Sequence, residues 1–93
     1  KPTIVQVHDA DCASCVRLQR NLKRALKDFD RAEYNYVLAD LKQQNGRLWA
    51  GARGVSYTTL VFADANGEVV GGVVGERTTT ALVNELNEFF GQN

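Results

Sequence analysis

The stretch that decides the fold runs from Thr3 to Cys15 and reads TIVQVHDADCASC. Its first part, Thr3–His8, is β-branched and mostly apolar, which predicts a central strand covered on both faces. Its second part ends in the chain's only two cysteines, and a helical pattern begins at the first of them. Cys12 is therefore expected at the N-terminus of a helix, where unpaired backbone N–H groups and the helix dipole stabilise a thiolate.

This helix is predicted from Cys12 to about Phe29, because its apolar residues form one stripe: Cys15, Leu18, Leu22, Ala25, Leu26 and Phe29. Its other side is basic, with Arg17, Arg20, Arg24 and Lys27. We interpret this basic side as a solvated helix surface rather than a binding site.

The middle of the chain predicts a second strand over Tyr34–Asp40 and then a short helix around Arg47–Arg53. This helix is expected to end at Gly54 and to bury Leu48, Trp49 and Ala52.

The last third predicts a hairpin and a closing helix. Strands are expected over Thr59–Ala63 and Glu68–Val74, joined at Asn66-Gly67, since both of these residues tolerate positive φ. Gly71-Gly72 predicts a bulge or a bend in the second strand. Thr78 or Thr79 is expected to cap a helix that ends at Gly91, with its inner face formed by Leu82, Val83, Leu86, Phe89 and Phe90.

The predicted order is β-α-β-α-β-β-α, an α/β fold with a four-stranded mixed sheet flanked by helices. The first two strands are joined through a helix and are expected to be parallel, by a right-handed crossover. At 93 residues the chain, residues 1–93, is expected to form one domain.

The composition excludes some classes of function. Eleven basic residues balance eleven acidic ones, and a general nucleic-acid or membrane-surface binder usually has a basic excess. No apolar run approaches the roughly 20 residues that span a bilayer.

A strand, Cys-x-x-Cys at a helix start, β-α-β, a hairpin and a closing helix together resemble the thioredoxin superfamily. The resemblance covers nearly the whole chain. The segment Gly54–Phe62 looks like the family's stretch leading into its third core strand, and Asn66–Val70 looks like its hairpin turn. Gly75 resembles the glycine that lies near the family's active site.

The resemblance implies a thiol–disulfide oxidoreductase, with Cys12 as the attacking thiolate and Cys15 as the resolving thiol. Residues three apart lie on the same helix face, so both sulfurs can meet while only the first is exposed. The implied partners are a protein or small-molecule disulfide substrate and a thiol electron donor. No metal or organic cofactor is expected, and we expect a monomer.

The sequence departs from the family at three positions. Thr58 stands where a cis-proline usually precedes the third strand; we expect a trans Tyr57–Thr58 peptide and a Thr58 hydroxyl that hydrogen-bonds a sulfur. Gln6 replaces a buried aspartate that thioredoxins often carry, and Gln cannot accept the proton of Cys15. Asp11 replaces the tryptophan before the first cysteine.

These features predict the lining and the tuning of the site. Tyr57, Thr58 and Gly75 are expected to line it, and Asp11 and His8 to adjust its charge. Asp9 and Asp11 disfavour a thiolate at the first cysteine, which makes the disulfide form relatively more stable and favours a reductase or electron-relay role.

Other readings remain open. A non-catalytic thioredoxin-like binding module is the main alternative. A zinc site has only His8 to add to the two cysteines, and a structural disulfide would close too short a loop to stabilise the fold much. The chain starts at Lys1 without a methionine, from which we expect processing or trimming. The compartment is uncertain, with a periplasmic location slightly preferred over a cytoplasmic one.

Overall fold

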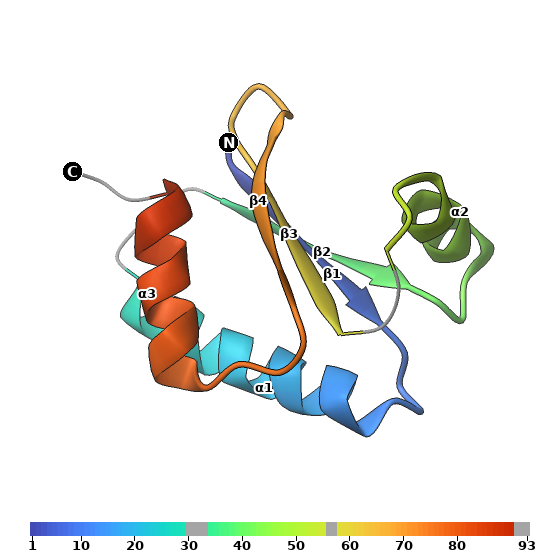
Figure 1. Ribbon diagram of the computed structural model, residues 1–93, viewed down its shortest axis with the longest axis horizontal. Coiled ribbons are helices and arrows are strands. Elements are labelled where there is room, and N and C mark those ends of the chain that lie inside the picture. Colours follow the sequence, from blue (N-terminus) through green and yellow to red (C-terminus); the bar gives the residue numbers. More distant parts are fainter. Residues whose placement is uncertain (30–33, 56–57, 91–93) are drawn as a thin grey trace.

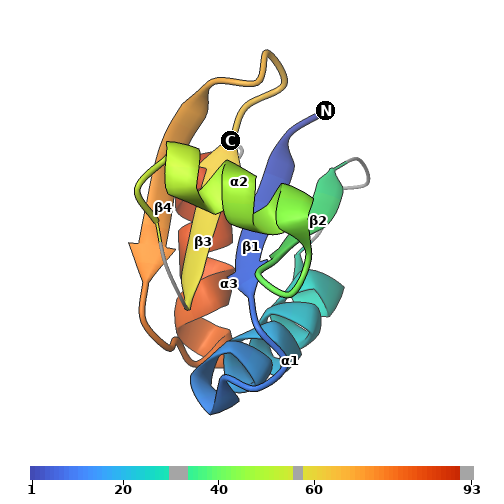
Figure 2. The ribbon, with the colours of Figure 1, turned by 90° about the vertical axis from the view of Figure 1, so that its right-hand side faces the viewer.

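The computed structural model describes residues 1–29, 34–55 and 58–90. The elements follow the predicted order β-α-β-α-β-β-α, and the strands form one four-stranded mixed sheet in the order β2-β1-β3-β4. Helices α1 and α3 cover one face of the sheet, and α2 lies on the opposite face (Figures 1 and 2).

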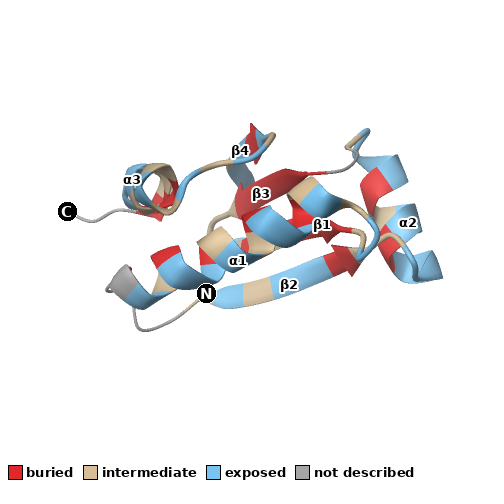
Figure 3. Cartoon of the chain, turned by 90° about the horizontal axis from the view of Figure 1, so that it is seen from below, coloured by how far each residue is buried: buried red, intermediate tan, exposed pale blue. Residues whose placement is uncertain are grey.

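Strand β1 (Thr3–His8) lies at the centre of this sheet, as its apolar sequence predicts. It pairs in parallel with β2 (Asn35–Asp40) and antiparallel with β3 (Thr59–Ala63). Figure 3 shows that burial is concentrated on β1 and β3, whereas much of β2 is exposed. The carboxyl end of β1 leads directly into the cysteines.

Helix α1 (Ala13–Asp28) matches the predicted helix to within a residue at each end. Its apolar stripe is buried except for the half-buried Leu26, and its basic side is exposed as interpreted from the sequence. Helix α3 (Thr79–Phe90) is capped by Thr78, whose hydroxyl accepts the Ala81 N–H at 3.1 Å. The main core lies between these two helices and three strands of the sheet, β1, β3 and the fourth strand. It is formed by Ile4, Leu18, Leu22, Ala25, Phe29, Leu60, Phe62, Val73, Leu82, Leu86 and Phe90.

Helix α2 (Gln44–Ala52) differs from its prediction. It begins before Arg47, Leu48 is 63% exposed, and Ala52 is exposed as well. The predicted burial was wrong for Leu48 and Ala52, because the fully buried residues of α2 are the small Gly46 and Ala50. Trp49 is half-buried and packs against the apolar cluster on this face of the sheet.

The two docking residues of α2 sit close to β1 and β2. A Cβ on Gly46 would collide with the Asp40 backbone, so only glycine fits there. Ala50 packs with Val7 and Ala39. Gly54 follows the helix with a φ of 66°, in keeping with its predicted role at the end.

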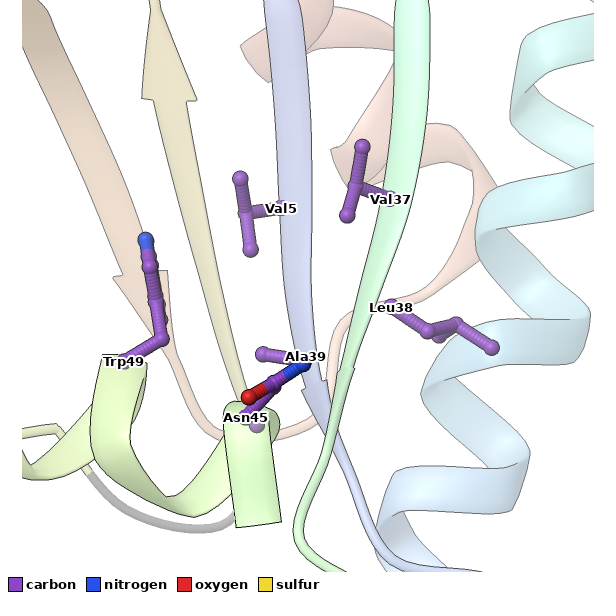
Figure 4. A pocket seen from close by; sticks show the side chains of 7 residues that line it. Val5, Val37, Leu38, Ala39, Asn45 and Trp49 are labelled. Carbon is purple, nitrogen blue, oxygen red and sulfur yellow. The ribbon is translucent and has the colours of Figure 1, made fainter. Parts of the chain in front are cut away.

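A shallow apolar depression of about 210 Å³ lies between α2 and the sheet (Figure 4). The residues that line it come from β1, β2 and α2: Val5, Val37, Leu38, Ala39, Asn45, Gly46 and Trp49. It contains neither cysteine.

The hairpin forms as predicted. Gly67 adopts a φ of 85° in its turn, and Asp64 Oδ1 accepts the N–H groups of Asn66 and Glu68. Strand β4 (Val69–Val74) carries a bulge, since Phe62 pairs with Gly71 and Ala63 pairs with Val69. Within the described ranges, no helix combines the length and the apolar character needed to cross a membrane.

Candidate active site

Cys12 is the residue that caps α1. Its backbone is extended, its Sγ accepts the Cys15 N–H at 3.2 Å, and its own carbonyl accepts the Val16 N–H at 3.1 Å. Its N–H donates to the Asp9 carbonyl at 2.9 Å, which holds the loop against the helix entrance. The first cysteine therefore stands at the helix N-terminus, as the sequence predicts.

The two cysteines differ in access to solvent. Cys12 is partly exposed and Cys15 is fully buried, and both thiols are free. An open depression of about 420 Å³ adjoins the first sulfur and is lined by Asp9, Asp11, Cys12 and Ser14. A substrate can thus approach Cys12 directly, and Cys15 only through it.

Thr58 brings a hydroxyl to both sulfurs. Its Oγ1 lies 3.7 Å from Cys12 Sγ and 3.6 Å from Cys15 Sγ, so the expected hydroxyl–sulfur contact is confirmed. It also lies 2.8 Å from Ser14 Oγ, which is 3.3 Å from Cys12 Sγ. The sequence did not predict a role for Ser14, because a serine between the two cysteines does not by itself indicate which side chain it contacts.

The backbone of Thr58 is unusual. Its φ is 56°, in the left-handed region that β-branched residues rarely occupy. The Gly75 N–H donates to the Thr58 carbonyl at 2.8 Å, and Gly75 itself has a φ of 96°. Gly75 therefore contacts the site through its hydrogen bond with the backbone of Thr58. The left-handed backbone of Thr58 costs conformational energy, and in this conformation its hydroxyl points at both cysteines.

The pKa of Cys12 reflects opposing influences. Partial burial has the largest effect and raises the pKa, because a charged sulfur loses hydration. Hydrogen bonds from the Cys15 side chain, the Ser14 hydroxyl, the Cys15 backbone and the Thr58 hydroxyl favour the thiolate. Together they prevail and lower the pKa of Cys12 from its ordinary 9.0 to about 7.

Asp11 is exposed beside the cysteine and forms an ion pair with Lys42. Lys42 hydrogen-bonds its carboxylate and lowers the pKa of that group, and Lys42 Nζ also lies 3.6 Å from Asp9 Oδ1. The carboxylates thus oppose the thiolate less than the sequence suggests. Lys42 was missed, although the parallel pairing of His8 with Asp40 places the residues that follow them side by side.

Three other predicted residues have different outcomes. His8 is buried at the end of β1, and within the described ranges no hydrogen bond joins its ring to either sulfur; its Nδ1 has no partner there. Its tuning role stays a prediction. Tyr57 and the geometry of the Tyr57–Thr58 peptide lie outside the described residues. Trp49 lies on α2 with Arg53 4.3 Å above its ring, away from the cysteines.

Gln6 occupies the position expected for an acid in thioredoxins and is fully buried. Its Nε2 donates to the Cys15 carbonyl at 3.1 Å, and its Oε1 accepts the Tyr36 hydroxyl at 2.6 Å. An amide therefore ties the cysteine helix to the sheet. In the described part of the chain, no three His, Cys, Asp or Glu side chains gather in a way that would hold a metal ion.

No family model matches the chain, and no curated protein matches it closely. Many solved structures resemble it. Trxlp from Edwardsiella tarda EIB202 is 25% identical with a TM-score of 0.75, over 91% of this chain and 81% of that one. A thioredoxin from Aeropyrum pernix is 26% identical with a TM-score of 0.70, over 94% and 73% of the two chains.

An uncharacterised thioredoxin-like protein from Clostridium perfringens is 22% identical with a TM-score of 0.81, over 99% of this chain and 73% of that one. The likeness therefore extends over the whole arrangement of strands and helices. The chain is a thioredoxin-like protein by fold, with a Cys-x-x-Cys pair at the entrance of α1.

Proposed function

We propose that the protein is a thiol–disulfide oxidoreductase that works by dithiol–disulfide exchange. The observation that supports this most is the pairing of a partly exposed Cys12, hydrogen-bonded at a helix N-terminus, with a buried Cys15 one turn deeper. A pKa of about 7 leaves about half of the Cys12 thiols ionised at neutral pH, and the thiolate is the nucleophile.

In the first step, the Cys12 thiolate attacks one sulfur of a substrate disulfide. A mixed disulfide forms, and the other substrate sulfur leaves with the electron pair of the broken bond. In the second step, Cys15 attacks Cys12 Sγ and releases the remaining substrate thiol. The protein is oxidised to a Cys12–Cys15 disulfide, and an external thiol donor returns it to the dithiol.

A reductase or electron-relay direction fits the electrostatics. A strongly oxidising pair stabilises its thiolate far more, with a pKa of about 3.5 in a known oxidant. The pKa of about 7 at Cys12 stabilises the dithiol only moderately, which favours a more reducing couple. Equilibration with glutathione buffers would measure this potential, and a strongly oxidising value would contradict this direction.

A non-catalytic binding module is the second candidate. It is favoured by Thr58, which stands in the place of the family's proline with a backbone in the left-handed region. In that case the surface around Cys12 would bind a partner without catalysing disulfide exchange.

Reduction of insulin or of a small disulfide separates the two candidates. We expect the wild type to turn over and the Cys12→Ser and Cys15→Ser variants to lose turnover, with the double variant as the baseline. Wild-type turnover no faster than the double serine variant would reject the enzyme. Retained capture of a disulfide-bearing partner by the double variant would then support the binding module.

A further inference from the structure

Two hydroxyl groups connect the two sulfurs of the site. Cys15 Sγ lies 3.6 Å from Thr58 Oγ1, Thr58 Oγ1 lies 2.8 Å from Ser14 Oγ, and Ser14 Oγ lies 3.3 Å from Cys12 Sγ. Each hydroxyl can both donate and accept, so a proton can pass along the three contacts without leaving the protein. This series of contacts begins at the fully buried Cys15 thiol and ends at the partly exposed Cys12 thiol.

The resolving step needs an acceptor for the Cys15 proton. Cys15 must lose its proton as it attacks Cys12 Sγ, yet its side chain has no solvent exposure. The buried Gln6 side chain contacts the backbone of Cys15, but it cannot take this proton. Its amide already hydrogen-bonds the Cys15 carbonyl and the Tyr36 hydroxyl, and an amide has no basic atom. Among the described side chains, the Thr58 hydroxyl lies 3.6 Å from this thiol and can accept its proton.

We propose that Thr58 and Ser14 form a proton relay from Cys15 to the departing substrate sulfur, an inference that rests on the exchange function above. As Cys15 Sγ bonds to Cys12 Sγ, its proton passes to Thr58 Oγ1, the Thr58 proton passes to Ser14 Oγ, and the Ser14 proton passes to the leaving sulfur. The bond between Cys12 and the substrate breaks with its electron pair on that sulfur. The substrate leaves as a neutral thiol, and both hydroxyls end as they began.

The backbone supports this role. Thr58 is held at a φ of 56°, which carries a steric cost for a β-branched residue, while Gly75 holds its carbonyl at 2.8 Å. The result is a buried hydroxyl within reach of both sulfurs and of Ser14. A proton relay through the Thr58 hydroxyl would explain why this strained backbone conformation is present at the site.

The resolving step can be followed by itself. When reduced protein is mixed with a symmetrical disulfide, the first thiol appears at a rate that depends on disulfide concentration, and the second appears at a rate that does not. Cys12 is already bonded to the substrate in the second phase, so changes in the ionisation of its thiol do not affect that rate. Thr58→Val and Ser14→Ala remove the relay, whereas Thr58→Ser and Ser14→Thr keep each hydroxyl as matched controls.

The leaving thiol provides the decisive comparison. An aryl thiol of low pKa leaves readily as an anion, whereas an alkyl thiol such as glutathione benefits from a proton. We expect Thr58→Val and Ser14→Ala to slow the second phase about 10-fold or more with glutathione disulfide, and much less with an aryl disulfide. The hydroxyl-retaining controls should recover the wild-type rate within about threefold, since general acid–base catalysis carries the effect.

An unchanged second phase in both hydroxyl-free variants, or an equal slowing for aryl and alkyl thiols, would overturn the relay. If Thr58→Val does not fold, Ser14→Ala decides, because Ser14 is partly exposed in the first turn of α1. Failure of the proposed function looks different: the wild type would then show no first phase, and Cys15→Ser would form no mixed disulfide.

Discussion

At the scale of single residues, hydrogen bonds from neighbouring groups rather than a strong opposite charge lower the pKa of Cys12. Its Sγ accepts hydrogen bonds from the backbone of Cys15 and meets the hydroxyls of Ser14 and Thr58. These contacts outweigh the effect of burial and bring the pKa to about 7. The chemistry of the thiol is therefore sensitive to the loss of a single hydroxyl.

The thiolate of Cys12 should titrate near neutral pH. We expect the rate of alkylation and the ultraviolet thiolate absorbance to rise as pH increases through about 7 and to level off above it. Ser14→Ala should move this midpoint upward, because a hydrogen bond that favours the anion is lost, and Ser14→Thr should leave it in place. A wild-type midpoint near 9.0, or no shift in Ser14→Ala, would contradict this origin of the lowered pKa.

Sequence reasoning located part of this site. Cys12, Cys15 and Thr58 were predicted because a strand, a helix start and a hairpin bring them together in the thioredoxin arrangement. Ser14 and Lys42 were missed because their roles depend on side-chain distances, 2.8 Å to Thr58 Oγ1 for Ser14 and a carboxylate pair for Lys42. A motif gives positions along the chain, whereas these contacts require the register between segments.

At the scale of elements, strong periodicity was enough for β1, α1, the hairpin and α3. β1, α1, β3 and α3 each bury several large apolar residues, and the bounds of all these elements were predicted to within one or two positions. The burial predicted for Leu48 and Ala52 of α2 was wrong, because close approach to the Asp40 backbone requires a glycine, Gly46. Such a steric requirement leaves no hydrophobic signal in the sequence.

Two glycines of α2 offer a matched test of this docking. A Cβ on Gly46 meets the Asp40 backbone, whereas a Cβ on Gly51 meets no atom within 4 Å. Gly46→Ala should lower the free energy of unfolding by about 1–3 kcal/mol through overpacking. Gly51→Ala should raise it by about 0.5–1 kcal/mol, because alanine favours the helix. Urea denaturation measures both, and equal effects of the two changes would contradict the proposed docking.

The buried Gln6–Tyr36 contact should couple the cysteine helix to the first two strands. Gln6→Leu removes the Gln6 acceptor of the Tyr36 hydroxyl, which keeps only its hydrogen bond with the Gln19 side chain, and should lower the free energy of unfolding by about 1–3 kcal/mol. Adding Tyr36→Phe should recover part of that loss, because the hydroxyl that has lost its Gln6 acceptor is removed. If the losses of the two single variants simply add in the double variant, the contact between Gln6 and Tyr36 contributes nothing to the free energy of unfolding.

At the scale of the whole molecule, the two faces of the sheet are unequal. The face covered by α1 and α3 contains the main core, whereas the α2 face has a small cluster of Val7, Ala39 and Ala50 beside the apolar depression (Figures 1 and 4). The cysteines lie at the end of the sheet where β1 enters α1. The two cysteines thus lie beside the better-packed face of the sheet.

The ionisation of Cys12 links redox chemistry to global stability. Because the pKa is lower in the folded protein than the ordinary 9.0, the unfolded chain binds more protons between pH 7 and 9. The free energy of unfolding of the reduced protein should therefore rise with pH across this window and lose that gain as pH falls through about 7. Cys12→Ser should lack this rise, and identical pH profiles for the two proteins would contradict the linkage.

The central claim is that Cys12 attacks a disulfide and Cys15 resolves the product. The most direct measurement treats the Cys15→Ser and Cys12→Ser proteins with glutathione disulfide near pH 7 and locates bound glutathione by mass spectrometry. We expect one glutathione on Cys12 in the first variant and none on the buried Cys15 in the second. Absence of the Cys12 adduct, or an equal yield on Cys15, would contradict the account.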